Sequence, residues 1–594
     1  MKVSDYVAQF LAQQGIRHAF VITGGASVHL IDSIAKTPGI EYVCPQHEQA
    51  GAMAADAYAR VTENLGVAIS TSGPGATNMI TGICCSYYDS VPTLYITGQV
   101  ASFRLKRDMG IRQNGFQETD IVDMVKPITK YAVLVSDAHN IRYELEKAVY
   151  LARSGRPGPV LVDICDDIQR CDINPDNLKP FHPDPDLTDK SVLPDQFNAC
   201  IELINQAQRP VLILGWGVHL SHARKEARLF ADILRIPVTM TWGLRDLLPY
   251  GYPHLIDTFG THGTRAGNFA VQNSDLILVI GSRLDTHLTG TPFTTFARNA
   301  KKIVVDIDLT ELKRFTRLGG NVDIEIHCDA KKFLEGMISQ REKIHTRDIS
   351  PWTGWLSKCH ADFSLSESVT IEKEGVDPYL FVKNLADEAK DGDVFFIDSG
   401  CAVAWMMQAF RCKNNQRIFS AFNNTPMGYA LPASIGASFA LNKGSVICVT
   451  GDGGLQMNIQ ELITVIRHNL PVKIFLFNNK GYSMVQQTQE QWLDSRYEAT
   501  TVDGGLGFPD FVKVAEAYGY PVITITGNRE ISDAVKKSLA MEGPVFVNIE
   551  IPPEARVIPQ VKFGRPIEDP EPLIRREQFL EHMIVPPLDV SLHL

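Results

Sequence analysis

Residues 446–479 read VICVTGDGGLQMNIQELITVIRHNLPVKIFLFNN, and they decide the fold of the last third of the chain. Two apolar runs typical of buried strands flank a helical pattern that begins at about Asn458. The first run ends in a Gly-Asp-Gly turn at 451–453, and the second ends at Asn479, 27 residues after Asp452. A strand, a helix and a second strand at this spacing indicate a βαβ unit of a parallel sheet.

The polar residues at these two strand ends are suited to hold a cation and a diphosphate. Adjacent parallel strands bring their carboxyl ends together, so Asp452 and Asn479 could give hard oxygen ligands to one Mg²⁺ ion. The glycines let a diphosphate approach the backbone, and the helix N-terminus attracts its charge. The alternative is a structural turn that happens to carry an aspartate. The turn followed by two asparagines resembles the thiamin-diphosphate motif, which favours the first interpretation.

The same alternation of strands and helices runs through the chain and predicts an α/β fold of three doubly wound parallel-sheet domains. With the thiamin-enzyme resemblance, we expect a pyrimidine-binding (PYR) domain at 1–172, a central FAD-binding-like domain at 190–345, a diphosphate- and Mg²⁺-binding (PP) domain at 370–555 and a tail at 556–594. A Pro- and Asp-rich linker spans 172–195. The expected strands are 18–22, 66–70, 93–97, 160–164, 210–215, 237–241, 276–281, 302–307, 394–397, 446–450, 473–478 and 545–549.

The composition excludes several classes of protein. With 44% hydrophobic and 21% charged residues, the chain of 594 residues has an ordinary globular composition. The net charge is −11 and the sequence has no basic block, so it lacks the positive charge that binding to nucleic acid requires. The 11 cysteines form no CxxC pair, so we expect reduced thiols in the cytoplasm. The sequence has no signal-peptide pattern and no uncharged apolar run of about 18 residues, so we expect no membrane association.

A carboxylic acid suited to thiamin chemistry stands in the first block. The cofactor's 4′-amine can remove the proton from C2 of its thiazolium ring when an acid hydrogen-bonds the opposite ring nitrogen. Glu48 opens a helix of small residues, AGAMAADAYA at 50–59, that lets a flat ring approach. In a low-dielectric cleft its pKa would rise, which keeps the acid protonated. The alternative is a glutamate that only favours the helix dipole.

Nearly the whole chain resembles the large subunit of acetohydroxyacid (acetolactate) synthase, through QHEQAGAMAADAYAR (46–60), TSGPGATNMITGICCSYYDSVPTLYITGQV (71–100), FQET (116–119) and SGRPGPVLVDI (154–164). The resemblance implies a homo-oligomer in which Glu48 of one chain faces the Gly-Asp-Gly site of its partner. It implies that Gly25 and Gln117 line the reacting centre, and that Met427 wedges the cofactor into a bent form rather than only filling the core. It further implies thiamin-diphosphate contacts at Gly400, Gly451, Gly453, Gly454 and Met484, and a metal contact at Gly481 beside Asp452 and Asn479.

Strand ends of the second block resemble the FAD-binding positions of this subfamily, where the flavin is largely structural. Glycines at strand ends let a dinucleotide approach, and arginine can pair with its phosphates. The alternative is a vestigial nucleotide fold that binds ADP or nothing. The positions concerned are Arg156, Gly215, Gly217, Thr261, His262, Gly281, Arg283 and Asp285.

Three places depart from the synthase pattern. His287 stands where the family has an arginine that grips the carboxylate of the acceptor 2-oxoacid, and histidine cannot supply the bidentate fork. Thr488 stands where the family has a tryptophan that stacks on the acceptor, which opens the pocket. Near the diphosphate, Cys401-Ala402 replaces a Gln-His pair.

We therefore predict a carboligase that depends on thiamin diphosphate, Mg²⁺ and FAD. It would decarboxylate pyruvate and transfer the two-carbon acyl anion equivalent to a carbonyl acceptor, a larger ketone such as a nucleotide-linked keto-sugar. The alternatives are an acetolactate synthase with rewired acceptor contacts, a 2-oxoacid decarboxylase, and a catalytically silent scaffold subunit. Intact Glu48, Asp452 and Asn479 argue against the silent subunit.

Overall fold

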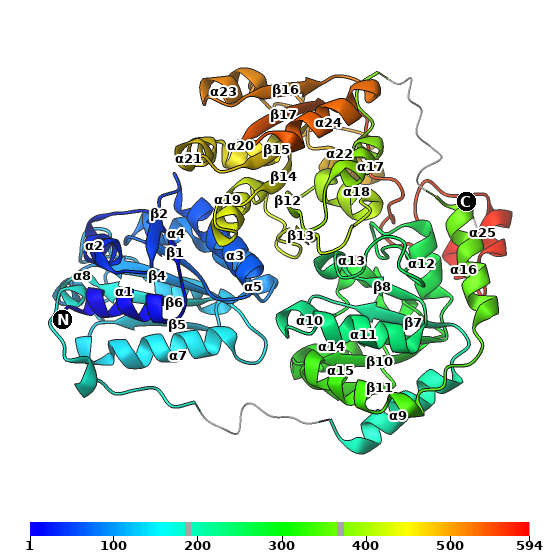
Figure 1. Cartoon of the computed structure of the whole chain (residues 1–594), viewed down its shortest axis with the longest axis horizontal. Coiled ribbons are helices and arrows are strands. Elements are labelled where there is room, and N and C mark those ends of the chain that lie inside the picture. The colour runs from blue at the N-terminus through cyan, green and yellow to red at the C-terminus, as the bar shows by residue number, and fades with distance from the viewer. Residues whose placement is uncertain (184–191, 365–373, 593–594) are drawn as a thin grey trace.

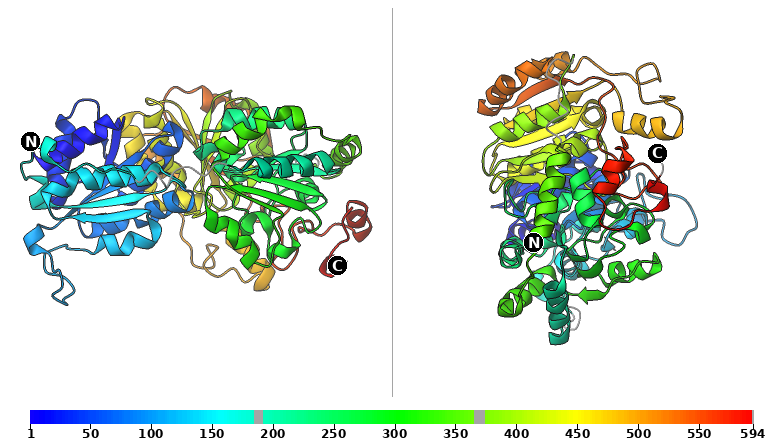
Figure 2. Two further views of the ribbon diagram at one scale, coloured as in Figure 1. Left: turned by 90° about the horizontal axis from the view of Figure 1, so that it is seen from below. Right: turned by 90° about the vertical axis from the view of Figure 1, so that its right-hand side faces the viewer.

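The computed structural model describes residues 1–183, 192–364 and 374–592, and it contains three α/β sheets whose strands all pair in parallel. Each sheet belongs to one lobe of the molecule, namely the N-terminal domain (blue to cyan), the middle domain (green) and the C-terminal domain (yellow to orange) in Figure 1. Helices cover both faces of the sheets, as the turned views of Figure 2 show. The expected fold class is therefore confirmed.

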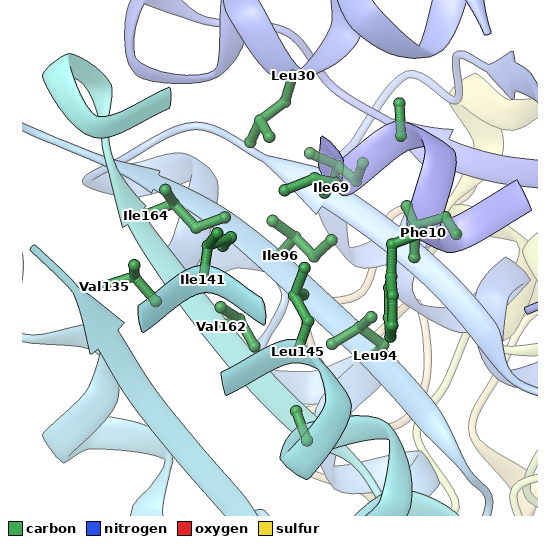
Figure 3. Packing of buried hydrophobic residues seen from close by; sticks show 14 of the residues in the cluster. Phe10, Leu30, Ile69, Leu94, Ile96, Val135, Ile141, Leu145, Val162 and Ile164 are labelled. Atoms are coloured by element: carbon green, nitrogen blue, oxygen red, sulfur yellow. The ribbon is translucent and has the colours of Figure 1, made fainter. Parts of the chain in front are cut away.

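The N-terminal sheet has the order β2-β1-β3-β4-β6-β5. Its inner strands β3, β4 and β6 are buried along their whole length. Successive side chains therefore pack into two cores, one on each face of the sheet. Leu94 and Ile96 pack on the face shown in Figure 3, whereas Tyr95 between them packs on the other face. Its strands and helices are β1 His18–Val21, β2 Glu41–Val43, β3 Gly66–Ser70, β4 Thr93–Gln99, β5 Tyr131–Val135, β6 Val160–Cys165, α1 Val3–Gln13, α2 Val28–Lys36, α3 Glu48–Thr62, α4 Pro74–Asn78, α5 Ile80–Tyr88, α6 Ile121–Val125, α7 Ile141–Arg153 and α8 Asp166–Gln169.

The middle sheet has the order β11-β10-β9-β7-β8, and its central strands are again apolar and buried. Its elements are β7 Pro210–Leu214, β8 Val238–Met240, β9 Leu276–Ile280, β10 Lys301–Asp306, β11 Ile324–His327, α9 Pro194–Gln206, α10 Gly217–Leu220, α11 Arg224–Leu234, α12 Arg265–Gln272, α13 Thr286–Thr289, α14 Leu309–Arg317, α15 Ala330–Ser339 and α16 Ser350–Asp362.

The C-terminal sheet has the order β13-β12-β14-β15-β17-β16. Its elements are β12 Val394–Ile397, β13 Arg417–Phe419, β14 Val446–Gly451, β15 Val472–Asn478, β16 Val522–Ile525, β17 Val545–Glu550, α17 Pro378–Glu388, α18 Cys401–Ala409, α19 Ala430–Ala440, α20 Asp452–Met457, α21 Leu462–His468, α22 Ser483–Trp492, α23 Phe511–Ala517 and α24 Ile531–Ala540.

The helix expected from about Asn458 is placed wrongly, because α20 already begins at Asp452. Of the two glycines that were interpreted as a turn, Gly451 ends β14 and is the N-cap of α20, and Gly453 lies in the first turn of the helix. Asn458 ends α20 ahead of α21. Every expected strand is present to within two residues at each end. Five further strands were not expected, and all five lie at the edge of a sheet: β2, β5, β11, β13 and β16.

The tail after β17 packs against the middle domain and includes α25 Arg576–Glu581. Glu568 pairs with Arg298 at 2.7 Å, and the side chain of Asn273 bonds the backbone of His582 and Ile584 at 2.9 and 2.7 Å. The expected domain limits at 190 and 370, and residues 184–191 of the linker, lie outside the described residues. Within the described ranges, no helix has the length and apolar composition needed to span a bilayer.

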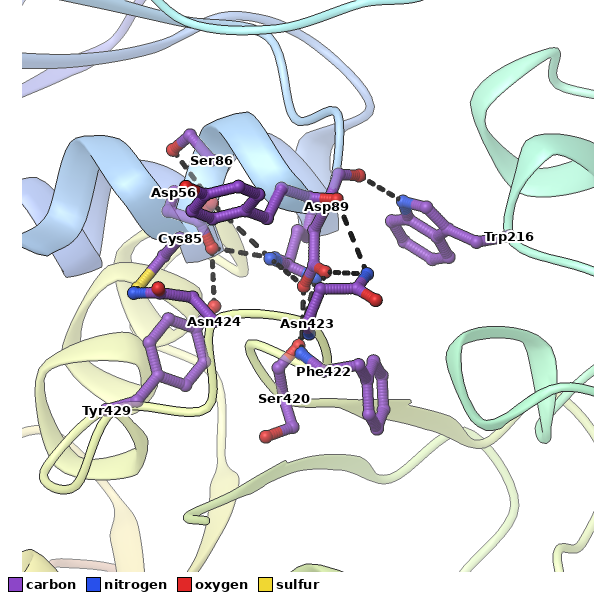
Figure 4. Close-up of polar contacts among 12 residues, drawn as sticks. Asp56, Cys85, Ser86, Asp89, Trp216, Ser420, Phe422, Asn423, Asn424 and Tyr429 are labelled. Atoms are coloured by element: carbon purple, nitrogen blue, oxygen red, sulfur yellow. Dashed lines mark hydrogen bonds and ion pairs between the residues drawn. The ribbon is translucent and has the colours of Figure 1, made fainter. Parts of the chain in front are cut away.

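A buried charge cluster joins the domains, and we call its members Asp56, Arg60, Asp89 and Tyr429 the Arg60 cluster (Figure 4). The Arg60 guanidinium contacts Asp56 at 2.6 Å and Asp89 at 2.8 Å, and it donates to the carbonyl of Ser420 at 3.0 Å. Tyr429 donates to Asp56 at 2.5 Å. Although burial opposes the charge, Asp56, Tyr429 and Asp89 hold the pKa of Arg60 well above its ordinary value.

The same cluster reaches the middle domain. The carbonyl of Asp89 accepts a hydrogen bond from Nε1 of Trp216 at 2.8 Å, and the Arg60 guanidinium lies 5.7 Å from the Trp216 ring. The Asp89 carboxylate also accepts from the backbone of Phe422 and Asn423 at 2.9 and 3.1 Å. One guanidinium thereby fixes elements of all three domains.

We predict that Arg60→Met destabilises the protein by about 3–5 kcal/mol, because two buried carboxylates lose their cation. Arg142→Met is the matched control. Its partner Glu146 is partly exposed, and such surface pairs contribute about 0–1 kcal/mol. Denaturant unfolding followed by tryptophan fluorescence measures both variants. Equal midpoints for the two variants would contradict the role given to Arg60.

Candidate functional site

A cavity of about 370 Å³, the C-terminal cavity, lies at the carboxyl ends of β12, β14 and β15. In open α/β sheets this is where ligands bind, because helices begin there and strand order reverses. The structure brings to its wall the following expected cofactor and metal positions: Gly400, Met427, Gly451, Asp452, Gly453, Gly454, Asn479, Gly481 and Met484.

Two glycines of this wall leave space for a ligand. A Cβ added to Gly400 or Gly451 would meet no atom within 4 Å. Gly400 has φ +74° and precedes the first turn of α18, whose free backbone N–H groups suit an anion. These residues therefore fit a diphosphate group.

The other glycines of the motif are required by packing. A Cβ on Gly453 would lie 2.3 Å from the Tyr482 ring and 2.8 Å from Cε of Met427, and one on Gly454 would lie 2.8 Å from Asp398. Gly453 thus lets Met427 lie close over the motif, where its thioether side chain also lines the cavity.

The carboxylate of Asp452 is oriented by the backbone around it. Its Oδ1 accepts from Gly453 N at 2.6 Å, and its Oδ2 accepts from Asn479 N at 3.0 Å and Lys480 N at 2.6 Å. Burial raises the pKa of Asp452 to about 6, although these N–H donors oppose the shift. A buried carboxylate of this kind is stabilised by a cation.

Asn479 is fixed beside it, because its Nδ2 donates to Oγ of Ser483 at 2.5 Å. This leaves Oδ1 of Asn479 as its free oxygen. Asp452 and Asn479, with the Gly481 backbone, make an oxygen donor set that suits Mg²⁺. Among the described residues there is no cluster of three or more His, Cys, Asp or Glu that would suit a softer metal.

Three expected catalytic residues gather elsewhere, at the carboxyl ends of β1 and β3 in the N-terminal domain, and we call them the N-terminal half-site (Gly25, Glu48 and Gln117). Oε2 of Glu48 accepts from Nδ2 of Asn78 at 2.9 Å. A Cβ on Gly75 would lie 3.4 Å from Glu48, and one on Gly73 would lie 3.1 Å from Gln117. None of the three lines the C-terminal cavity of the same chain.

Gln117 stands on an exposed loop held from beneath by Glu118. The buried Glu118 carboxylate accepts from the backbone N–H groups of Lys106, Asn114 and Gly115 at 2.6, 2.8 and 3.1 Å. Gln117 itself has φ +64°, a strained value for a residue with a side chain. Around it, large apolar side chains face solvent, namely Phe103, Met109, Ile111 and Phe116.

A second cavity, the middle cavity, runs along the carboxyl ends of all five strands of the middle sheet. Four strand spacings give it a length of about 19 Å, and its volume is about 160 Å³, so its shape is elongated. Of the expected FAD positions, those that line it are Arg156, Gly217, Gly281, Arg283 and Asp285, whereas Gly215, Thr261 and His262 do not.

The glycines of this cavity have a packing reason of their own. Gly217 N donates to Gly281 O at 2.8 Å, so the turns after β7 and β9 cross in contact. A Cβ on Gly215 would lie 2.4 Å from that same carbonyl. The arginines have protein partners as well: Arg156 pairs with Asp308 and Glu311 at 3.1 Å.

Trp242 and His287 line both cavities and form their junction. Nε2 of His287 lies 3.0 Å from Nδ1 of His262, and the two rings stack. Nε2 of Gln560, in the tail, donates to Nε2 of His262 at 3.0 Å. With Gln560 as donor, neutral His262 carries its proton on Nδ1, within reach of both Nε2 of His287 and Oγ1 of Thr261. When Nε2 of His287 accepts this proton's hydrogen bond, His287 has Nδ1–H as its own donor.

The junction carries no positive charge at neutral pH. Burial lowers the pKa of His262 to about 3, and His287 adds to the shift; burial also lowers the pKa of His287 against the effect of Asp285. Nε1 of the buried Trp242 has no hydrogen-bond partner among the described residues. Of the described residues that line the C-terminal cavity, none is lysine or arginine.

Two residues of the junction were not predicted from the sequence. Trp242 lies in a short 3₁₀ turn after β8 without any motif, and Gln560 lies in a tail without periodicity. Thr488, which was expected at the acceptor pocket, is not part of the cavity wall; its hydroxyl instead donates to the carbonyl of Met484 at 3.3 Å. Cys401 and Ala402 do line the cavity.

Comparison with known proteins agrees with this arrangement. Family models of thiamine pyrophosphate enzymes match residues 1–124 (N-terminal TPP binding domain), 197–337 (central domain) and 398–549 (C-terminal TPP binding domain). The chain is 33% identical over 581 residues to acetolactate synthase 2, chloroplastic, of Nicotiana tabacum, covering 96% of this chain and 85% of that protein. It is 33% identical to the acetolactate synthase large subunit of Buchnera aphidicola (94% and 97% covered) and to the probable large subunit of Methanocaldococcus jannaschii (98% of each).

Proposed function

The chain belongs to the acetolactate synthase family of thiamine pyrophosphate enzymes, and on that premise we propose that it joins the acyl unit of pyruvate to a carbonyl acceptor that has no carboxylate. The observation that carries the proposal is the uncharged His262–His287 pair in a cavity whose described wall has no lysine or arginine. A 2-oxoacid acceptor would find no cation there for its carboxylate. A ketone or aldehyde needs none.

The donors at the junction suit a neutral carbonyl group. As a carbon–carbon bond forms, the acceptor oxygen gains negative charge, which preorganised N–H donors stabilise. Nε1 of Trp242 and Nδ1 of His287 are the donors available, since neither makes a hydrogen bond among the described residues. A larger ketone, such as a nucleotide-linked keto-sugar, is the acceptor that we propose.

The remaining residues have roles toward the cofactor. Thiamin diphosphate, when bound, supplies the carbanion-stabilising chemistry that lets a 2-oxoacid lose CO₂. Asp452, Asn479 and Gly481 would hold its Mg²⁺, and Met427 would support its bent form. Glu48 would hold a proton at its carboxyl group for a ring nitrogen of the cofactor.

We propose that two copies of the chain complete each site. Gly25, Glu48 and Gln117 do not line the C-terminal cavity of their own chain, although Met427 of its wall also lines a pocket with His47 and Gln49, which flank Glu48. The exposed apolar loop around Gln117 suits burial against a second copy, whose C-terminal cavity needs that half-site.

We propose FAD as the ligand of the middle cavity. The course of the cavity along all five strand ends, with Arg156 and Arg283 on its wall, supports a dinucleotide. A vestigial site that binds ADP or nothing is the alternative. A cytoplasmic location is supported by the 11 cysteines, all free thiols.

Acetolactate synthase itself is the second candidate function. The names of the matched relatives favour it, because the identity extends over nearly the whole chain. A 2-oxoacid decarboxylase would use the same cofactor residues without an acceptor.

We predict that two inactive variants complement each other. Glu48→Gln and Asp452→Ala are each expected to lose pyruvate turnover by orders of magnitude. A co-expressed mixed dimer has one site with both native residues, so activity should return to about a quarter of the native value for random pairing. Co-expression of Glu48→Gln with Glu48→Ala is the control. An inactive Glu48→Gln and Asp452→Ala mixture in which mass spectrometry detects mixed dimers would place each site within one chain.

We predict that the purified protein is yellow and releases FAD on denaturation, because the middle cavity suits a dinucleotide. The absorbance spectrum and chromatography of the released ligand measure this. A spectrum without a flavin band, in a protein that added FAD neither binds nor stabilises, would overturn the assignment.

We predict that His287→Arg shifts acceptor choice toward 2-oxoacids, because a guanidinium adds a charged pair of about 1.5–3 kcal/mol, or roughly tenfold or more in discrimination. The assay offers pyruvate with 2-oxobutyrate and a keto-sugar nucleotide in competition, and His345→Arg on the surface is the control. If 2-oxobutyrate is the best acceptor of the unmodified protein, the chain is an acetolactate synthase.

A further inference from the structure

A third cleft lies between the middle and C-terminal domains, behind the junction of the two cavities. It is lined by Arg245, Lys383 and Arg411, with His360 and Asp257 at its side. Its volume is about 100 Å³. Neither the thiamin chemistry nor the middle cavity uses any of these five residues.

Arg245 is the unusual member of this group. Its side chain is only 6% exposed, yet its Nε has no hydrogen-bond partner among the described residues. A buried N–H group without an acceptor is unfavourable, because the cost of its desolvation is not offset. Arg245 lies on the wall of the cleft, so a ligand there could supply the missing acceptor.

The neighbouring charges are also positive. Lys383 on α17 and Arg411 after α18 form no ion pair within the part of the chain that the structure describes, and Arg411 lies 4.5 Å over the ring of Tyr250. The one carboxylate of the cleft, Asp257, is already bonded to Nδ1 of His360 at 3.0 Å. Among the described residues, Arg245, Lys383 and Arg411 therefore face the cleft without an ion-pair partner, since Asp257 is bonded to His360.

We propose that this cleft binds a tetrahedral oxyanion, the phosphate group, between Arg245, Lys383 and Arg411. A cavity of about 100 Å³ has room for a group of this size. Arginine forks match the geometry of phosphate oxygens, and lysine adds a point charge. The group is either free phosphate or the end of a phosphomonoester whose remainder lies in solvent.

The cleft is linked to the junction by two short connections. Arg245 N donates to Trp242 O at 3.3 Å across one 3₁₀ turn, so both side chains stand on the same turn. Gln408, on the cleft wall, donates to the carbonyls of His262 and Pro559 at 3.1 and 2.8 Å. An anion bound to Arg245 therefore acts on the turn that positions Trp242.

The test uses the full-length holoenzyme with thiamin diphosphate and Mg²⁺ in saturating excess, so that phosphate cannot act through the cofactor site. Calorimetry and thermal unfolding are measured with inorganic phosphate against chloride at equal ionic strength. We expect phosphate to bind and to raise the Tm more than chloride does. Arg245→Met and Lys383→Met should each weaken binding at least tenfold, whereas Arg529→Met on the surface should leave it unchanged.

Lys383→Met keeps the test decisive if Arg245→Met fails to fold, because Lys383 is a half-buried residue of α17 at the cleft rather than a core residue. Phosphate binding that is equal in both variants and the native protein overturns the proposal, as does a Tm response no larger than that to chloride. AMP and glucose 6-phosphate form the second arm. Tighter binding of either than of phosphate assigns a monoester, and the reverse assigns free phosphate.

The coupling between the cleft and Trp242 is tested separately, through the KM for pyruvate, and this test rests on the proposed function. Phosphate should change the KM for pyruvate in the native enzyme and in Arg529→Met, and not in Lys383→Met. Binding without a kinetic effect would remove the link to Trp242 and keep the site. Binding measured by calorimetry does not depend on which acceptor the enzyme uses.

Discussion

The buried guanidinium of Arg60 is the constraint on which the arrangement of the two cavities depends. It extends from α3 of the N-terminal domain to Asp89 beside it and to the backbone of the segment at 420–423. That segment leads directly to Met427, which lies over the Gly-Asp-Gly motif. Because the backbone carbonyl of Asp89 also accepts from Nε1 of Trp216, the turn after β7 is tied to the same residue. A displacement at Arg60 would therefore change both cavities together.

A buried ionic cluster is a poor source of net stability, since desolvation offsets most of its Coulombic gain. The advantage of the cluster is that it fixes how the groups it joins are oriented. Apolar side chains at a three-domain contact can repack with little loss, whereas a guanidinium with two carboxylates and a carbonyl has one satisfactory geometry. Glycine at the contact between α3 and α19 also restricts how the two domains pack. A Cβ on Gly436 would lie 2.0 Å from the carbonyl of Ala54, so only glycine permits this approach of the two domains.

The strands that could be predicted from the sequence and those that could not differ in burial. Inner strands such as β9 and β14 are covered on both faces, so they are continuous apolar runs bounded by glycine or proline. The strands that were not expected are all at sheet edges. There one side is open and residues such as those of β16 are mostly half-exposed, which gives a mixed pattern that resembles a loop. The start of α20 was misplaced for a different reason, because a helix whose first turn contains two glycines has the composition of a turn.

For the site, the sequence was sufficient where the residues follow two neighbouring parallel strands, as Asp452 follows β14 and Asn479 follows β15, because parallel pairing brings these strand ends together. It was not sufficient where function arises from contacts between distant segments. His287 can be recognised as a departure from a family pattern, but its neutrality cannot, since that depends on burial beside His262. Gln560, which bonds His262, lies 298 residues further along the chain. A histidine in place of arginine suggests a weaker cation. In this environment it is a neutral donor held in one tautomer, so the substitution changes the kind of acceptor group that the cavity suits rather than the strength with which it holds the same one.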